Sequence, residues 1–97
     1  MRRATKVDST QAPIVAMFRA MGCSVLDLSG VGKGVPDLLI GCQGQSILVE
    51  CKTATGKLTA QQVAFHALWK GKALIVRSPE EAQDVVLFIR GRLRRAR

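Results

Sequence analysis

The stretch from Val35 to Lys52, VPDLLIGCQGQSILVECK, decides the fold. Its two ends, Val35 to Gly41 and Ser46 to Lys52, are dense in branched apolar residues, which favour β-strands. Pro36 near the start of the first segment fits a strand entrance or an edge. The four residues 42–45 (CQGQ) leave room only for a tight hairpin connection. The stretch therefore predicts two adjacent antiparallel strands.

The register of this hairpin would bring two carboxylates together. If the turn is centred on Gln43–Gly44, paired positions sum to 87, and Asp37 faces Glu50 directly. Opposed side chains lie about 4.5–5.5 Å apart at Cβ, where like charges destabilise a sheet. Lys52 projects from the same face as Glu50, whereas Cys51 points into the opposite layer. A shift of the turn by one residue would separate the carboxylates onto opposite faces.

Two carboxylates placed together on apolar strands indicate a cation between them. Mg²⁺ is held by one or two carboxylates together with phosphate oxygens and water. A nearby ammonium, here Lys52, can orient or activate an attacking water or neutralise charge on a phosphate. Asp37, Glu50 and Lys52 therefore predict a Mg²⁺- or Mn²⁺-dependent phosphodiesterase acting on nucleic acid. The structural alternative is an ion pair between Glu50 and Lys52, with Asp37 as a turn or rim residue.

The rest of the sequence predicts a single domain over residues 1–97. Its predicted class is α/β, with a mixed α+β sheet. The predicted order of the elements is α-β-β-β-α-β-α. The first helix is expected to begin at the caps 8–10, to bury Ile14, Met17, Phe18 and Met21, and to end at Gly22. The remaining segments are expected to be strands at 23–28 and 73–77, a helix at 60–69 and a last helix from Ser78. We expect Val63, Leu68 and Trp69 to face the core, and we expect the last helix to present Val85, Leu87, Phe88, Ile89 and Leu93.

The charge of the chain favours a polyanionic partner. The net charge is +8, and five arginines lie within residues 90–97. Such an excess favours nucleic acid, whose phosphates it neutralises with release of counterions. The less favoured alternative is a solubilising tail or a cationic helix end. Segments 1–8 and 90–97 are both expected to be flexible.

Three further features of the sequence bear on where in the cell the protein is located. No apolar run approaches the roughly 20 residues that cross a bilayer, and the basic N-terminus leads into no signal segment. Three cysteines without C-x-x-C spacing predict reduced, buried thiols and argue against structural zinc. We therefore expect a cytoplasmic protein that is neither secreted nor bound to a membrane.

A family resemblance accompanies these residues. Pro36-Asp37, followed by Glu50-Cys51-Lys52, is similar to the P-D…E-x-K signature of the PD-(D/E)XK nuclease superfamily. More closely, VGKGVPDLLIG…ILVECKTATGKLTAQQVAFH resembles the stand-alone VRR-NUC domains of phages and prophages, over about Gln11 to Val76. P-D…E-x-K alone is a loose pattern, and the G-K-L-T-x-x-Q segment together with the element order makes it more specific.

The resemblance implies a restriction-endonuclease-like PD-(D/E)XK core and a DNA endonuclease that works as a homodimer on branched or junction DNA, leaving 5′-phosphate and 3′-hydroxyl ends. It implies that Asp37 and Glu50 bind Mg²⁺ or Mn²⁺, with the Cys51 backbone carbonyl as a further ligand. Lys52 would be the catalytic lysine, and Gln62 would support it and the substrate phosphate. Where relatives often place a glutamate on the first helix, the nearest match is Gln11, a further candidate ligand that implies a weaker or single-metal site.

Other residues are candidates for DNA contact, each with a structural alternative. The candidates are Lys33, Lys57, His66, Arg92, Arg94 and Arg95. Lys33 lies in a glycine-rich loop whose glycines could serve a turn alone, and a lone helical histidine such as His66 is more often structural. The whole chain could also be a non-catalytic DNA-binding module or a partner-binding subunit. The first would bind DNA without a divalent cation, and the second would bind DNA little at physiological salt.

Overall fold

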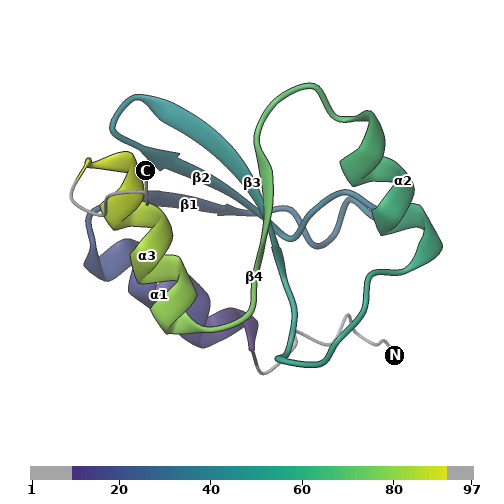
Figure 1. Cartoon of the computed structure of the whole chain (residues 1–97), viewed down its shortest axis with the longest axis horizontal. Coiled ribbons are helices and arrows are strands. Elements are labelled where there is room, and N and C mark those ends of the chain that lie inside the picture. Colours follow the sequence, from purple (N-terminus) through teal and green to yellow (C-terminus); the bar gives the residue numbers. More distant parts are fainter. Residues whose placement is uncertain (1–9, 92–97) are drawn as a thin grey trace, which may run out of the picture.

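The computed structural model describes residues 10–91, and within them the elements follow the predicted order (Figure 1). The elements are α1 (Gln11–Ala20), β1 (Ser24–Asp27), β2 (Leu38–Cys42), β3 (Gln45–Cys51), α2 (Ala60–Leu68), β4 (Ala73–Val76) and α3 (Pro79–Ile89). The segment 1–8 and the arginines at 92, 94 and 95 lie outside the described residues, and so does Leu93.

The strands form one mixed sheet in the order β1-β2-β3-β4. β1 and β2 are antiparallel, β2 and β3 are antiparallel, and β3 and β4 are parallel. The parallel pair requires a crossover, and α2 lies in that connection. The predicted class, a mixed α+β sheet, is therefore confirmed.

The hairpin register is the one predicted from the turn. Leu38 pairs with Val49 and Cys42 pairs with Gln45, so paired positions sum to 87. The predicted four-residue connection was wrong, because Cys42 and Gln45 already belong to the strands. Only Gln43 (φ 53°) and Gly44 (φ 77°) form the turn, and both are left-handed, as a type I′ hairpin turn requires. The first strand of the hairpin also begins three residues later than predicted, at Leu38.

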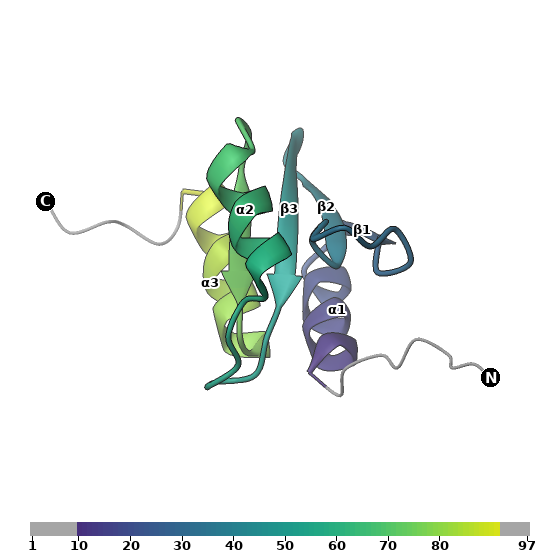
Figure 2. The ribbon, with the colours of Figure 1, turned by 90° about the vertical axis from the view of Figure 1, so that its right-hand side faces the viewer.

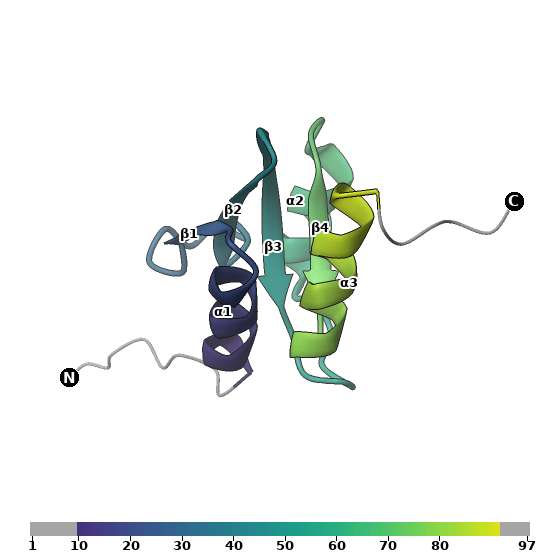
Figure 3. The same cartoon turned by 90° about the vertical axis from the view of Figure 1, so that its left-hand side faces the viewer.

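One face of the sheet is covered by α1 and α3, which contact each other (Figure 3). Ile14 and Phe18 of α1 and Val86 of α3 are fully buried in this layer. The strand residues that belong to the same core are Leu38, Ile40, Cys42, Ile47, Val49, Cys51 and Val76. Cys51 is thus on the core side, as predicted, and Glu50 points to the other face. Cys23, Cys42 and Cys51 are buried thiols that form no disulfide bond, also as predicted.

The helix α2 lies apart from α1 and α3 (Figures 1 and 2). None of its residues is buried. The predicted core positions were wrong here: Val63 is 52% exposed, Leu68 76% and Trp69 47%. The apolar spacing predicts the helix correctly. The core-forming face of the sheet is already covered by α1 and α3, so the apolar side chains of α2 are not buried there.

The last helix buries a different set from the one predicted. Ala82 and Val86 are fully buried, whereas Phe88 is 44% exposed. Val85 and Ile89 pack against the core from its margin, as expected. None of the three helices between residues 10 and 91 has the length and apolarity needed to cross a bilayer.

Candidate active site

Asp37 is fixed across the two central strands by its own carboxylate. It immediately precedes β2, and its Oδ2 accepts the Cys51 backbone N–H of β3 at 2.8 Å. The Asp37 carbonyl accepts the Leu28 N–H at 2.7 Å, which ties the same residue to the end of β1. Asp37 therefore has little freedom to move away from Glu50, the position that the register places opposite it.

Glu50 is a buried carboxyl group with an incomplete hydrogen-bond set. It is 2% exposed, and its Oε2 accepts the Gln62 Nε2 at 3.1 Å. Its Oε1 is also buried and receives no hydrogen bond from any residue in the described part of the chain. A buried polar atom without a partner costs roughly 1–3 kcal/mol. A proton held between Glu50 and Asp37, or a bound cation, would satisfy this oxygen.

The pKa of Glu50 is raised from 4.5 to about 8. Burial is the main cause, the hydrogen bond and negative charge of Asp37 add to it, and Lys52 opposes them with a smaller effect. In the absence of a cation the Glu50 carboxyl group therefore holds a proton at neutral pH. A divalent cation would replace that proton.

Gln62 connects this carboxyl group to the start of α2. Its Oε1 accepts the Thr59 N–H at 2.8 Å, and its own N–H donates to Thr59 Oγ1 at 3.2 Å. These two bonds form a capping box. Because the Oε1 atom is used by the cap, the amide Nε2 is the atom that faces Glu50.

Lys52 continues the pairing of β3 with β4, since its N–H donates to the Val76 carbonyl at 3.1 Å. The loop that follows is held by Arg77, whose Nη1 donates to the Thr53 carbonyl at 2.7 Å and to the Gly56 carbonyl at 2.8 Å. The sequence analysis missed Arg77, because backbone carbonyls as partners leave no trace in a sequence. Lys57, in the same connection, is exposed as a surface contact requires.

The donor set fits a divalent cation with two protein carboxylates. Asp37 and Glu50 supply the carboxylates, and Glu50 Oε1 has no competing donor. Residues 10–91 contain no cluster of three or more His, Cys, Asp or Glu side chains that could hold a metal, so the remaining ligands would be carbonyl, substrate and water oxygens. Mg²⁺ is commonly bound in this way, through one or two carboxylates.

Gln11, the further candidate ligand, is buried and contacts a different acid. It is 5% exposed, and a hydrogen bond from it lowers the pKa of Asp27, after the larger effect of the hydrogen bonds from Ser29. Asp27 ends β1, and its Oδ1 accepts the Ser29 N–H at 2.8 Å. Gln11 therefore belongs to a hydrogen-bond network with Asp27 and Ser29.

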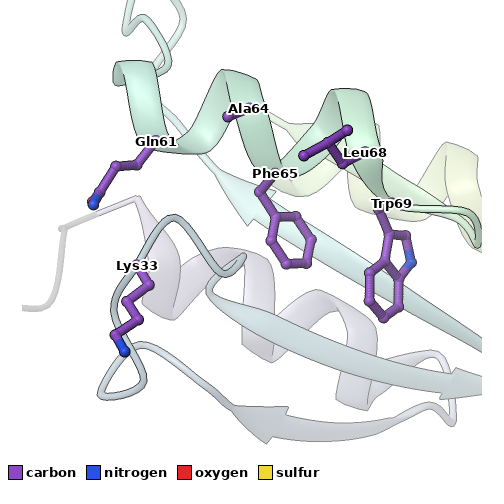
Figure 4. Close-up of a pocket in the computed structure, with 6 residues that line it drawn as sticks. All are labelled: Lys33, Gln61, Ala64, Phe65, Leu68 and Trp69. Carbon is purple, nitrogen blue, oxygen red and sulfur yellow. The ribbon is translucent and has the colours of Figure 1, made fainter.

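The remaining described candidates lie around α2. His66 has a buried Nε2 without a hydrogen-bond partner among residues 10–91, and its ring meets the edge of Phe65 at 6.2 Å between centroids. Lys33 is exposed, and it lines a cavity together with Phe65 and Trp69 (Figure 4). The sequence analysis did not select Phe65, because a single phenylalanine on a helix carries no functional signal.

Comparisons of the chain with protein-family models, characterised proteins and solved structures gave no match. The site consists of two close carboxyl groups, a lysine directly after β3 and a glutamine oriented by a helix cap. One oxygen of the buried carboxyl group receives no hydrogen bond from a conventional donor among residues 10–91.

Proposed function

We propose that the chain is a metal-dependent endonuclease of the PD-(D/E)XK type, similar to the stand-alone VRR-NUC domains, which hydrolyses phosphodiester bonds in DNA. The observation that carries the proposal is the pairing of Asp37 with Glu50 across the hairpin, with Glu50 Oε1 buried and without a donor. Asp37 has a structural partner in the Cys51 N–H, but the negative charge that it places beside the buried Glu50 is unfavourable for the fold alone. A bound cation would offset that charge.

The structural alternative, an ion pair between Glu50 and Lys52, accounts less well for the site. An ion pair that dominated the environment of Glu50 would lower its pKa, whereas burial and Asp37 raise the pKa to about 8. The effect of Lys52 on the pKa of Glu50 is weaker than those of burial and Asp37, so its ammonium can also serve a second anion. A substrate phosphate is a fitting partner for this ammonium.

The roles of the residues follow from their positions. Asp37 and Glu50, with the Cys51 carbonyl, would hold Mg²⁺ or Mn²⁺. Such a cation supplies Lewis acidity toward a phosphoryl oxygen and lowers the pKa of bound water. Lys52 would neutralise the negative charge that grows on the reacting phosphate. Gln62 keeps Glu50 in place through its amide donor, and the helix cap keeps Gln62 in place.

The proposed substrate is DNA, with selection by structure rather than by sequence. The net charge of +8 suits phosphate contacts that ignore sequence, and their strength falls steeply with salt. No base-reading motif accompanies the site. Junctions, flaps and other branched forms are therefore proposed as preferred substrates.

A homodimer is also proposed as the working form. Leu74 of β4 and Phe88 of α3 are 36% and 44% exposed beside a groove of about 410 Å³. Burial of such apolar surface between two copies would be favourable. The oligomeric mass in solution, measured over a range of protein concentrations, tests this proposal.

A specific observation favours a second candidate, a non-catalytic DNA-binding module. The acids of residues 10–91 do not form a metal cluster of three, and Gln11 is engaged with Asp27. Such a module would bind DNA with the same salt dependence and would need no divalent cation.

The experiment that separates the two uses a labelled four-way junction, a flap and a plain duplex, each with Mg²⁺, Mn²⁺ or EDTA. Lys52→Ala is compared with wild type, because it removes the ammonium and leaves both carboxylates. The nuclease proposal expects metal-dependent cutting by wild type, and DNA binding without cutting by the variant. Folded wild-type protein that binds all three DNAs but cuts none with either cation would establish the binding module instead.

A further inference from the structure

An open cavity of about 340 Å³ lies between α2 and the glycine-rich loop at residues 30–34 (Figure 4). Its lining residues are Lys33, Gln61, Ala64, Phe65, Leu68 and Trp69. The cavity is separate from the carboxyl pair, which α2 approaches through a different residue, Gln62. The two walls of the cavity determine which ligand it can accept.

One wall of the cavity is a pair of stacked aromatic rings. The Phe65 and Trp69 ring centroids are 5.2 Å apart with an angle of 16° between the planes. Trp69 is 47% exposed, so the stack is not covered by the rest of the described chain. Gly71 lies directly beside the indole, since a Cβ at this position would be 2.9 Å from Trp69 Nε1. A larger residue at position 71 would displace the ring.

The opposite wall carries a positive charge in an unusual backbone conformation. Lys33 has φ 60°, a left-handed value that side-chain-bearing residues rarely adopt. The next residue, Gly34, has φ 81° and touches α2 so closely that a Cβ there would be 2.4 Å from the Gln61 carbonyl oxygen. The close packing of the loop on α2 thus stabilises the strained backbone of Lys33. It also keeps Lys33 in the wall of the cavity that faces α2.

We propose that this cavity binds one unpaired nucleobase on the Phe65–Trp69 stack, with Lys33 contacting the phosphate of the same strand. Stacking on aromatic side chains suits every base and is worth about 1–3 kcal/mol per base. A base inside a duplex is already stacked and paired, so only an unpaired base can enter. The site would therefore provide the structure selectivity of the nuclease, and in this respect the inference rests on the proposed function.

The distance from Trp69 to the carboxyl pair is one that a single DNA strand can span. Trp69 lies seven residues after Gln62, which corresponds to about 10 Å along a helix. This length equals about three nucleotide steps at about 3.4 Å each. A strand whose unpaired base rests on Trp69 can therefore place a nearby phosphate beside Glu50.

A second copy of the chain is the competing occupant, and Lys33 argues against it. An apolar partner surface would remove water from the ammonium without replacing its contacts, which is costly. A nucleotide offers a π-face to the rings and an anion to the lysine. The ligand class that matches both walls is thus a single-stranded nucleic acid.

The first test uses the intrinsic fluorescence of the protein. The chain has one tryptophan and no tyrosine, so the emission reports on Trp69. In EDTA, single-stranded oligothymidylate should quench this emission, whereas a blunt duplex at equal nucleotide concentration should change it little. Equal quenching by both DNAs would overturn the proposal. A blue shift that grows with protein concentration in the absence of DNA would also overturn it, in favour of a second copy as the occupant.

The second test measures binding of a labelled flap and of a matched duplex by anisotropy, again in EDTA. Trp69→Leu keeps apolar volume but removes the π-face, and it should weaken flap binding roughly 5- to 100-fold without affecting the duplex. Trp69→Phe should restore most of the affinity. The control is Val63→Ala, on the same helix but outside the cavity. A loss that is equal for flap and duplex, or no loss at all, would overturn the proposal.

The charge contribution is tested by Lys33→Gln against Lys70→Gln, which removes an exposed lysine that does not line the cavity. Only the first should reduce the salt dependence of flap binding, and equal effects would contradict a special role for Lys33. Failure of this proposal and failure of the nuclease proposal are distinguishable. Cutting of DNA with Mn²⁺ depends on Lys52, whereas quenching and flap preference in EDTA depend on Trp69.

Discussion

Gln62 donates its Nε2 to Glu50 Oε2 at 3.1 Å while its Oε1 accepts the Thr59 N–H at 2.8 Å. One side chain thus joins the first turn of α2 to the buried carboxyl group of β3. If the amide turned over, its oxygen would face the carboxyl group and the cap would be lost. The helix therefore holds Glu50 through a donor and leaves the second carboxyl oxygen available.

Two substitutions separate the cap from the contact with Glu50. Gln62→Ala removes the contact with Glu50 and the cap bond from the Thr59 N–H, whereas Thr59→Ala removes the other cap bond and keeps the amide beside Glu50. Each should lower the free energy of unfolding by about 1 kcal/mol. Only Gln62→Ala should also weaken Mn²⁺ binding, by about 10- to 100-fold, as is typical when a residue that orients a metal ligand is lost. Urea unfolding and calorimetric Mn²⁺ titration measure the two effects, and equal Mn²⁺ affinity in both variants would contradict the positioning role.

The raised pKa of Glu50 predicts a pH dependence of stability in the metal-free protein. The pKa is 4.5 for an ordinary glutamate and about 8 in the folded chain. Between these values the folded state binds more protons than the unfolded state, so stability falls as the pH rises. In EDTA the melting temperature should decline from pH 5 to pH 8 relative to that of Glu50→Gln, which cannot ionise. Glu80→Gln, at an exposed position in α3, is the control and should follow the wild type. Parallel curves for wild type and Glu50→Gln would show that Glu50 ionises normally.

The hairpin and the carboxyl pair could be predicted from sequence because their determinants are local. Gly44 suits the left-handed conformation of the turn, and the centre of the turn, which was predicted correctly although its length was not, sets the register of every pair along the strands. Asp37 and Glu50 then follow by counting. The raised pKa of Glu50 could not be predicted, because its main cause is the burial of the side chain.

The environment of α2 could not be predicted, because spacing alone does not reveal which elements cover a helix. Leu68 and Trp69 stand at positions typical of an apolar face, yet they are 76% and 47% exposed. The same limit applies to Gly34, whose contact with Gln61 joins residues that are far apart in sequence. Arg77 is a similar case, since its partners are backbone carbonyls.

Asp37→Asn should show separately how much repulsion between the two carboxyl groups destabilises the fold and whether Asp37 binds the metal. The amide oxygen can still accept the Cys51 N–H, a bond of 2.8 Å in the native chain, while the negative charge that raises the pKa of Glu50 is gone. In EDTA at pH 8 the variant should therefore melt at a higher temperature than the wild type. Mn²⁺ should raise the melting temperature of the wild type, because it binds the folded state, and should not raise that of the variant. Asp84→Asn, at an exposed position in α3, is the control. Equal stabilisation of wild type and Asp37→Asn by Mn²⁺ would exclude Asp37 as a ligand.

Gly34→Ala and Gly32→Ala should differ in stability although both glycines are left-handed, with φ 81° and 77°. A Cβ at position 32 meets nothing within 4 Å, so Gly32→Ala costs only the conformational strain of about 1–2 kcal/mol. At position 34 the Cβ would be 2.4 Å from the Gln61 carbonyl oxygen, and backbone on both sides must move. Gly34→Ala should therefore lower the free energy of unfolding by a further ~1–3 kcal/mol, the usual cost of overpacking. Urea unfolding gives the comparison, and equal losses in the two variants would mean that the loop does not rest on α2 in solution. Since that contact holds Lys33 in the wall of the cavity that Trp69 also lines, Gly34→Ala should also reduce the quenching of Trp69 by single-stranded DNA.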